Sequence, residues 1–188
     1  MNIAIFFSGN GSNMLNIKNA VDEKKIEANI KVYICNNRNA KGIKKLKESR
    51  DNLIIIDHHN FSSINNWEKE VEKHLKNLEI SLICLAGFMK ILSKKFVKRW
   101  ERKIINIHPS LLPAFKGLNA QKQALNYGVK YSGCTIHYVN EELDSGEIID
   151  QSIVGISKNE TVSSLTKKIL IEEHKIYINA LRNIVKRN

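Results

Sequence analysis

Short apolar runs alternate along the chain with longer stretches whose apolar residues recur at helical spacing. Five runs are almost continuously apolar and rich in β-branched residues: 3–7, 30–35, 53–56, 80–85 and 104–107. Runs of this kind are typical of parallel strands buried on both faces. Three intervening segments combine helical spacing with polar outer faces: 13–21, 42–50 and 64–78. This alternation predicts an α/β fold with a doubly wound, mostly parallel sheet and right-handed crossovers.

The pattern changes after residue 130. Residues 134–139 and 148–154 are predicted strands joined by only a short segment. A connection that short permits antiparallel pairing but not a parallel crossover, so we expect an antiparallel hairpin in the C-terminal part. Residues 161–185 follow as a long final helix with an apolar stripe. Because no repeat or Pro/Gly-rich linker interrupts the pattern, we expect a single domain over residues 1–188.

The composition excludes a membrane or secreted class. Of 188 residues, 43% are hydrophobic and 26% charged, which is ordinary for a soluble globular protein. No stretch approaches the ~20 apolar residues that a membrane-spanning helix needs. Residues 1–7 lack the basic region of a signal peptide and are better interpreted as a first strand. We therefore expect a cytoplasmic protein with no membrane partner.

The net charge of +11 raises the question of nucleic-acid binding. The lysines are scattered along predicted helices and form no single block interleaved with aromatic residues, as a single-strand binding surface requires. We interpret the charge as solvated helix faces that can steer an anionic substrate. The expected partners are small molecules and not nucleic acid; a basic nucleic-acid module stays as an alternative that predicts strongly salt-dependent binding to oligonucleotides.

The cysteines and most histidines give no sign of a metal centre. The three cysteines lie far apart, and no pair has metal-ligand or redox-motif spacing: Cys35, Cys84 and Cys134. His58 and His59 follow the third predicted strand, and the sequence shows no ligand cluster near them. Three further histidines are interpreted as surface or structural residues: His74, His137 and His174. The sequence predicts no metal.

A glycine loop, SGNGSN at residues 8–13, connects the first strand to the first helix. Glycine lets the backbone approach a ligand closely, and a helix N-terminus offers free N–H groups, so the loop is suited to a phosphate. A dinucleotide site of an oxidoreductase is disfavoured, because Met14 replaces the third glycine and Asn36 and Asn37 follow the second strand in place of an acidic ribose ligand. A capped turn that binds nothing remains the other alternative.

Asn106 and His108 end the fifth predicted strand. The C-terminal ends of parallel strands are where α/β sheets bind ligands, and strand alternation places these two side chains on the same side. Pro109 and Pro113 stiffen the loop that follows. An amide that holds an oxyanion and an imidazole that moves a proton together suit acyl transfer. A purely structural pairing stays open at this point.

Asp144 lies in the tight connection of the late hairpin. A turn aspartate commonly bonds its own backbone. The functional alternative is a carboxylate that orients His108 and favours its imidazolium form. Periodicity alone does not decide between the two.

In these motifs the sequence closely resembles the folate-dependent phosphoribosylglycinamide formyltransferase family. The matching segments run through the whole chain in order: residues 8–13, 85–89, 106–113, 144–146 and 173–174. The resemblance implies a Rossmann-like formyltransferase fold with a phosphate-binding half, about residues 1–100, and a folate and catalytic half, about residues 85–188. It also implies that the enzyme transfers the formyl group of the co-substrate 10-formyltetrahydrofolate to the amine of 5-phosphoribosylglycinamide in de novo purine biosynthesis.

The resemblance also implies roles for individual residues. Asn106 would hold the oxyanion, His108 would donate a proton, and Asp144 would keep His108 charged and oriented. Five residues would bind the ribonucleotide: Gly11, Ser12, Asn13, Met14 and Glu173. Seven would bind the folate: Met89, Lys90, Ile91, Leu92, Asn106, Asn140 and Asp144.

Three positions depart from the family's pattern. Ile64 stands where a basic residue is usual, Lys90 where arginine is commoner, and Gln121 where histidine is usual. They bear on the strength of the substrate contacts and not on the reaction. The main alternative is another 10-formyltetrahydrofolate enzyme, either a deformylase or another formyltransferase such as the one acting on methionyl-tRNA. Those enzymes would need a further N-terminal or C-terminal domain, so the length favours the small ribonucleotide. Monomer and homodimer both remain open.

Overall fold

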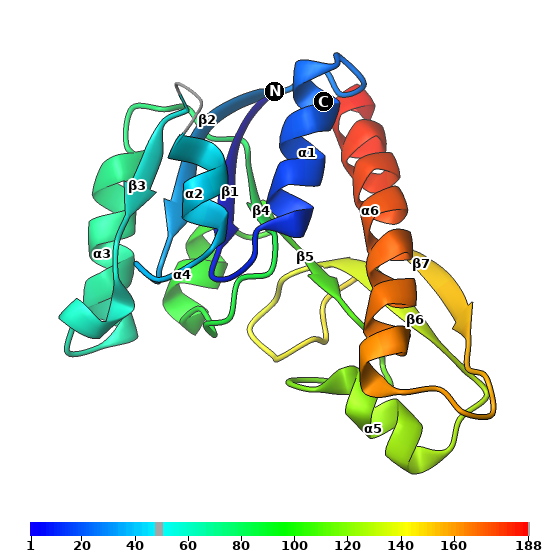
Figure 1. Cartoon of the computed structure of the whole chain (residues 1–188). Helices are drawn as coiled ribbons and strands as arrows, with labels where there is room; N and C mark the ends of the chain where they lie inside the picture. The colour runs from blue at the N-terminus through cyan, green and yellow to red at the C-terminus, as the bar shows by residue number, and fades with distance from the viewer. Residues whose placement is uncertain (48–50, 188) are drawn as a thin grey trace.

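The computed structural model describes residues 1–47 and 51–187. Its centre is a seven-stranded sheet in the order β3-β2-β1-β4-β5-β6-β7 (Figure 1). The strands are β1 (Asn2–Phe7), β2 (Asn29–Cys35), β3 (Leu53–Ile55), β4 (Leu82–Leu85), β5 (Ile104–His108), β6 (Tyr131–Tyr138) and β7 (Ile148–Gly155). The helices are α1 (Ser12–Asp22), α2 (Gly42–Lys47), η1 (His58–Asn60), α3 (Ile64–Leu75), α4 (Lys94–Arg99), α5 (Ala120–Tyr127) and α6 (Val162–Arg187).

The sheet is parallel from β3 to β5 and antiparallel at the other edge. β1 pairs in parallel with β2 and β4, and the same direction holds for β2 with β3 and β4 with β5. β6 pairs antiparallel with both β5 and β7. The predicted mostly parallel sheet with a C-terminal antiparallel hairpin is therefore confirmed.

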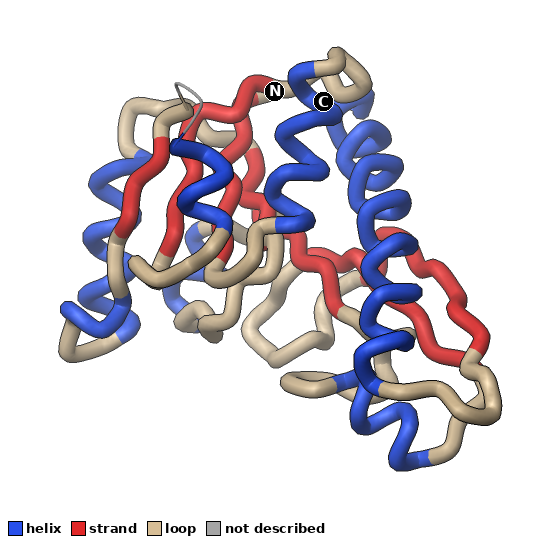
Figure 2. The backbone as a smooth tube through the Cα atoms, in the orientation of Figure 1, coloured by secondary structure: helices blue, strands red, loops and turns tan. Residues whose placement is uncertain are grey.

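Helices cover both faces of the sheet, which explains the continuous apolar runs (Figure 2). Alternate residues of β1 enter opposite layers: Ile3, Ile5 and Phe7 pack with α1, α2 and α6, whereas Ala4 and Phe6 pack with α3 and α4. Successive side chains of a strand point to opposite faces, so every residue of a strand that is buried on both faces is expected to be apolar.

The final helix agrees closely with its predicted range, but several shorter elements do not follow the pattern. The predicted helix 42–50 is α2 up to Lys47, and residues 48–50 lie outside the described residues. The short helices α4 and α5 and the turn of 3-10 helix η1 were not predicted, because six, eight and three residues give too little periodicity to recognise. Among the described residues, none of the helices has the length and apolar character needed to cross a membrane.

Candidate active site

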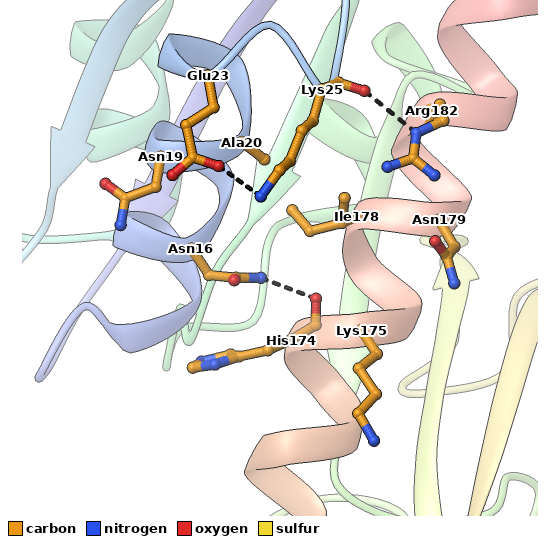
Figure 3. A pocket seen from close by; sticks show the side chains of 10 residues that line it. All are labelled: Asn16, Asn19, Ala20, Glu23, Lys25, His174, Lys175, Ile178, Asn179 and Arg182. Carbon is orange, nitrogen blue, oxygen red and sulfur yellow. Dashed lines mark hydrogen bonds and ion pairs between the residues drawn. The ribbon is translucent and has the colours of Figure 1, made fainter.

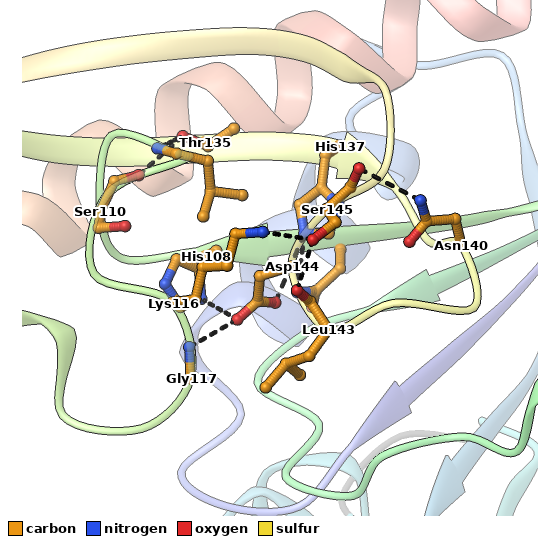
Figure 4. A network of polar contacts seen from close by, with 12 residues as sticks. His108, Ser110, Lys116, Gly117, Thr135, His137, Asn140, Leu143, Asp144 and Ser145 are labelled. Carbon is orange, nitrogen blue, oxygen red and sulfur yellow. Dashed lines mark hydrogen bonds and ion pairs between the residues drawn. The ribbon is translucent and has the colours of Figure 1, made fainter.

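A buried histidine meets a buried carboxylate at the C-terminal end of β5. His108 is the last residue of β5, and Asp144 lies in the loop between β6 and β7. Asp144 Oδ2 lies 3.3 Å from His108 Nδ1, and the side chains are only 8% and 6% exposed. Asp144 Oδ2 also accepts a 2.8 Å hydrogen bond from the Gly117 backbone N–H (Figure 4). The loop aspartate thus faces the histidine, as the functional alternative from the sequence requires.

His108 has a hydrogen-bond acceptor at each ring nitrogen. Its Nε2 lies 2.9 Å from the backbone carbonyl oxygen of Phe115. A carbonyl can only accept, so Nε2 carries a proton in this arrangement, while Nδ1 faces the Asp144 carboxylate. A histidine donates from both nitrogens only as the imidazolium. Each ring nitrogen of His108 thus faces an oxygen atom that can accept a hydrogen bond.

Asn106 lies in the same polar cluster but is connected to Asp144 through His137, which is not among the predicted site residues. In the antiparallel pairing of β5 with β6, Asn106 is opposite His137, and His108 is opposite Thr135. Asn106 Nδ2 lies 3.3 Å from His137 Nε2. The same His137 nitrogen lies 3.8 Å from Asp144 Oδ1. The structure thus brings Asn106, His108 and Asp144 together, with His137 between two of them.

His137 was not among the candidate residues, because its position in the sequence was interpreted as a surface or structural one. Its side chain is 2% exposed and contacts the candidate site. Strand alternation within residues 134–139 could place His137 on one face, but only the pairing of β6 with β5 shows that this face adjoins Asn106. Burial lowers the pKa of His137, although the Tyr138 carbonyl and Asp144 act in the opposite direction.

Two loops are joined to one another over the cluster. Besides the bond from Gly117 to Asp144, Lys116 Nζ donates to Ser145 Oγ (Figure 4). Asn140, a predicted folate contact, uses its side chain within its own loop: Nδ2 donates to the Ser145 carbonyl over 3.2 Å and Oδ1 accepts from the Glu142 N–H over 3.1 Å. Asn140 therefore shapes the loop that carries Asp144.

The glycine loop leads directly into α1. Gly11 has φ +70°, and a Cβ atom there would lie 2.8 Å from Met14 Cε and 3.0 Å from the Gly42 Cα, so any other residue would be strained at this position. Within the part of the chain that the structure describes, no side chain caps the first turn of α1, which starts at Ser12. Uncapped N–H groups at a helix N-terminus favour an anion.

Asn13 and Glu173, both predicted substrate residues, are in contact although 160 positions separate them. Asn13 Nδ2 donates to Glu173 Oε2 over 2.7 Å, and both residues are buried. Burial raises the pKa of Glu173, and the bond from Asn13 partly opposes this shift. Met14 is fully buried in the core, so only its backbone can face a ligand at the loop.

The predicted folate residues 89–92 follow β4 and adjoin the glycine loop. The Met89 N–H donates to Ser8 Oγ over 2.8 Å. Met89 and Ile91 are 67% and 70% exposed, which is high for large apolar side chains. Leu92 instead packs in the core beneath them, so the exposed apolar surface belongs to Met89 and Ile91, with the exposed Lys90 between them.

The histidine pair after β3 has a potential third ligand, Asp57, which was not predicted. One ligand atom each from Asp57, His58 and His59 lies within 4.8 Å of the others. Asp57 already binds Arg38 Nε at 2.7 Å and the His59 N–H at 3.0 Å, and the guanidinium would repel a cation. No role at this cluster follows from the contacts.

The structure also has a groove of about 590 Å³ between α1 and α6, away from the predicted catalytic residues (Figure 3). Its lining is mainly polar. Across it, the Asn16 side chain donates to the His174 carbonyl over 2.8 Å, and Arg182 Nε donates to the Lys25 carbonyl over 3.1 Å. The Asn16–His174 bond holds α1 against α6 next to the Asn13–Glu173 contact, since His174 directly follows Glu173.

Comparison with known proteins identifies the family. The family described as "Formyl transferase" matches residues 1–181. This chain belongs to the formyl transferase family. The resemblance predicted from the sequence is therefore confirmed, and with it membership of a family of enzymes.

The formyl transferase relatives cover almost the whole chain. The phosphoribosylglycinamide formyltransferase of Bacillus subtilis is 34% identical over 182 residues, which are 97% of this chain and 93% of that protein. The trifunctional purine biosynthetic protein adenosine-3 of Gallus gallus is 40% identical over 180 residues, or 96% of this chain, but this chain spans only 18% of its length. The glycinamide ribonucleotide transformylase 1 of Symbiobacterium toebii has a solved structure with a TM-score of 0.95 and 35% identity, covering 99% of this chain and 88% of that one.

Proposed function

We propose that this chain transfers the formyl group of 10-formyltetrahydrofolate to the amine of 5-phosphoribosylglycinamide, a step of de novo purine biosynthesis. The observation that carries the proposal is the buried cluster at the end of β5, in which both ring nitrogens of His108 face oxygen atoms and Asn106 joins the cluster through His137. The relative from Bacillus subtilis, similar over nearly its whole length, bears the name of this activity.

The proposed roles follow from the donors and acceptors in the cluster. The substrate amine attacks the formyl carbon, and the carbonyl oxygen becomes an oxyanion that an N–H of Asn106 stabilises. His108 donates a proton to the folate nitrogen as the carbon–nitrogen bond breaks and becomes neutral. The attacking amine then gives one proton back to His108, so charge and atoms balance. Asp144 keeps His108 oriented and favours its protonated form. These are roles for groups that the fold has already placed together.

The substrates would approach from two adjoining segments. We propose that the N-terminus of α1, with Gly11, Ser12 and Asn13, binds the phosphate and that Glu173 binds a ribose hydroxyl. The exposed apolar side chains of Met89 and Ile91 would support the folate ring system, since ligand pockets combine apolar walls with a few fixed polar groups. The bond between Ser8 and Met89 joins the two segments, which supports one catalytic domain over residues 1–188.

The proposal needs small-molecule substrates and assigns no step to a metal ion. The cytoplasmic location and the choice between monomer and homodimer remain predictions.

The test is an assay of 10-formyltetrahydrofolate consumption with and without 5-phosphoribosylglycinamide. We expect consumption that depends on the ribonucleotide and yields the formylated amine. The His108→Ala variant should lose about 10²- to 10⁴-fold in kcat, the usual contribution of a general acid, while His74→Ala, which changes a histidine on the distant α3, should turn over normally. Consumption independent of the ribonucleotide would show a hydrolase instead, and normal turnover by His108→Ala would refute the proposed proton donor.

A further inference from the structure

His137 lies on β6 directly opposite Asn106, and its ring has a different partner at each nitrogen. Nδ1 lies 2.9 Å from the Tyr138 backbone carbonyl oxygen. Nε2 lies 3.3 Å from Asn106 Nδ2. A carbonyl oxygen can only accept a hydrogen bond and an amide nitrogen can only donate one. The pair of contacts is satisfied by one form of the ring: neutral, with the proton on Nδ1 and the lone pair on Nε2.

The surroundings favour that neutral form. His137 is 2% exposed. Burial lowers its pKa most strongly, and the nearby His108 and Lys116 side chains lower it further, against the opposing effects of the Tyr138 carbonyl and of Asp144. His108 and His137 thus flank the same carboxylate with different partners: His108 Nε2 lies against a carbonyl oxygen, whereas His137 Nε2 lies against the Asn106 amide nitrogen.

The local backbone gives His137 its position. The pairing of β6 with β7 shifts its register between Ile136 and His137. Such irregularities redirect a side chain and recur beside active sites. On the other side, β6 keeps regular pairing with β5, which places His137 opposite Asn106.

We propose that His137 is a positioning residue that fixes the carboxamide of Asn106, accepting one N–H at Nε2 so that the second N–H points into the reaction space. The inference rests on the proposed function, because it concerns the amide to which oxyanion stabilisation is assigned. If His137 carried a proton on Nε2, that proton would turn toward Asp144 Oδ1, 3.8 Å away, and the Asn106 N–H would lose its acceptor. The tautomer of a buried histidine therefore sets which atoms of Asn106 a substrate meets.

The first test reads the ring directly and needs no catalysis. In nitrogen-15 spectra of the six histidines at pH 7, the signals absent from His137→Leu identify His137. We expect a protonated Nδ1 and an unprotonated Nε2 whose signal moves in Asn106→Ala, because the donor is lost. A protonated Nε2, or no response to Asn106→Ala, would overturn the proposal. This outcome is independent of whether the chain transfers formyl groups to the ribonucleotide.

The second test asks whether His137 acts through Asn106. His137→Leu should lower kcat about 10- to 100-fold, somewhat less than the ~10²- to 10³-fold cost of removing an oxyanion donor, with KM within about threefold. His137→Gln can place Oε1 near the Nε2 position and should recover most of kcat. In the Asn106→Ala background, His137→Leu should have almost no further effect, because residues that act as a unit are not additive.

The control is His74→Leu, which should leave kcat unchanged. A full additional loss from His137→Leu in the Asn106→Ala background, or an equal loss in His137→Gln and His137→Leu, would show that His137 only supports the fold. Absence of ribonucleotide formylation by the unmodified chain would refute the proposed function, and the nitrogen-15 spectra would then still decide the tautomer and the contact with Asn106.

Discussion

Replacing Gly146 by alanine should disable the site without unfolding the protein. A Cβ atom at this position would lie 1.7 Å from the Tyr138 carbonyl oxygen and 2.8 Å from the Tyr138 carbonyl carbon. Real Cβ contacts essentially never fall below 3.0 Å, so the backbone must move by the difference, about 1.3 Å. Tyr138 is held at the end of β6 by its pairing with Ile105 of β5. The loop that carries Asp144, two residues before Gly146, is therefore the part that moves.

The size of the effect follows from the contacts of Asp144. Its Oδ2 is 3.3 Å from His108 Nδ1 and 2.8 Å from the Gly117 nitrogen. A displacement of more than 1 Å breaks hydrogen bonds of this length, and misplacing a catalytic group by 1 Å costs about 100-fold in rate. We expect Gly146→Ala to lower kcat about 100-fold. The melting temperature should change little, because the loop is mostly exposed.

The assay is steady-state formyl transfer, with thermal unfolding followed by circular dichroism. Gly155→Ala is the matched control: Gly155 ends β7, and a Cβ atom there would meet none of the described atoms within 4 Å. Normal kcat in Gly146→Ala would refute the argument that this glycine fixes the loop. An equal loss in Gly155→Ala would show that any added methyl group in this hairpin is damaging.

Three further predictions concern a buried carboxylate, a helix cap and the three buried thiols. Glu173→Gln should raise the melting temperature at pH 7, because burial raises the pKa of Glu173 in the folded protein. A carboxyl group whose pKa is raised by folding destabilises the folded protein as the pH rises above the ordinary pKa of 4.5. The gain should vanish below that pH, and the variant should bind the ribonucleotide more weakly. Thr161→Ala should destabilise the protein by about 0.5–2 kcal/mol in urea unfolding, because Thr161 Oγ1 accepts the Ser164 N–H at the start of α6. The three buried thiols should resist a thiol reagent at pH 8 until the protein unfolds. The reason is that burial raises the pKa of each thiol, to about 12 for Cys84 and Cys134 and less far for Cys35.

The central part of the fold could be predicted from the sequence because burial on both faces leaves a strong local trace. The apolar runs 3–7 and 104–107 correspond to β1 and β5 within a residue at each end. The helices α4 and α5 could not be predicted, because their six and eight residues complete barely two turns. Their ends depend on caps such as the Ser93 side chain at the N-terminus of α4. A single serine is too common in a sequence to mark the start of a helix.

The sequence by itself determined which groups stand at the strand end and how they point. Asn106 and His108 are two residues apart in an apolar strand, so the strand's twofold period alone places them on one side. The family resemblance added Asp144 to the predicted catalytic residues. A short turn has no periodicity, so the direction of the Asp144 side chain could not be predicted from the sequence pattern. These inferences needed only residue order.

The tertiary structure alone decided what surrounds those groups. The Phe115 carbonyl at His108 Nε2, the Gly117 N–H at Asp144 and His137 beside Asn106 all come from segments that meet through loop closure or through the pairing of β6 with β5. Which strand lies next to β5, and in which register, depends on contacts distant in sequence, whereas the hydrophobic pattern records only burial. The direction of each hydrogen bond, and hence the expected protonation of each histidine, follows from those neighbours.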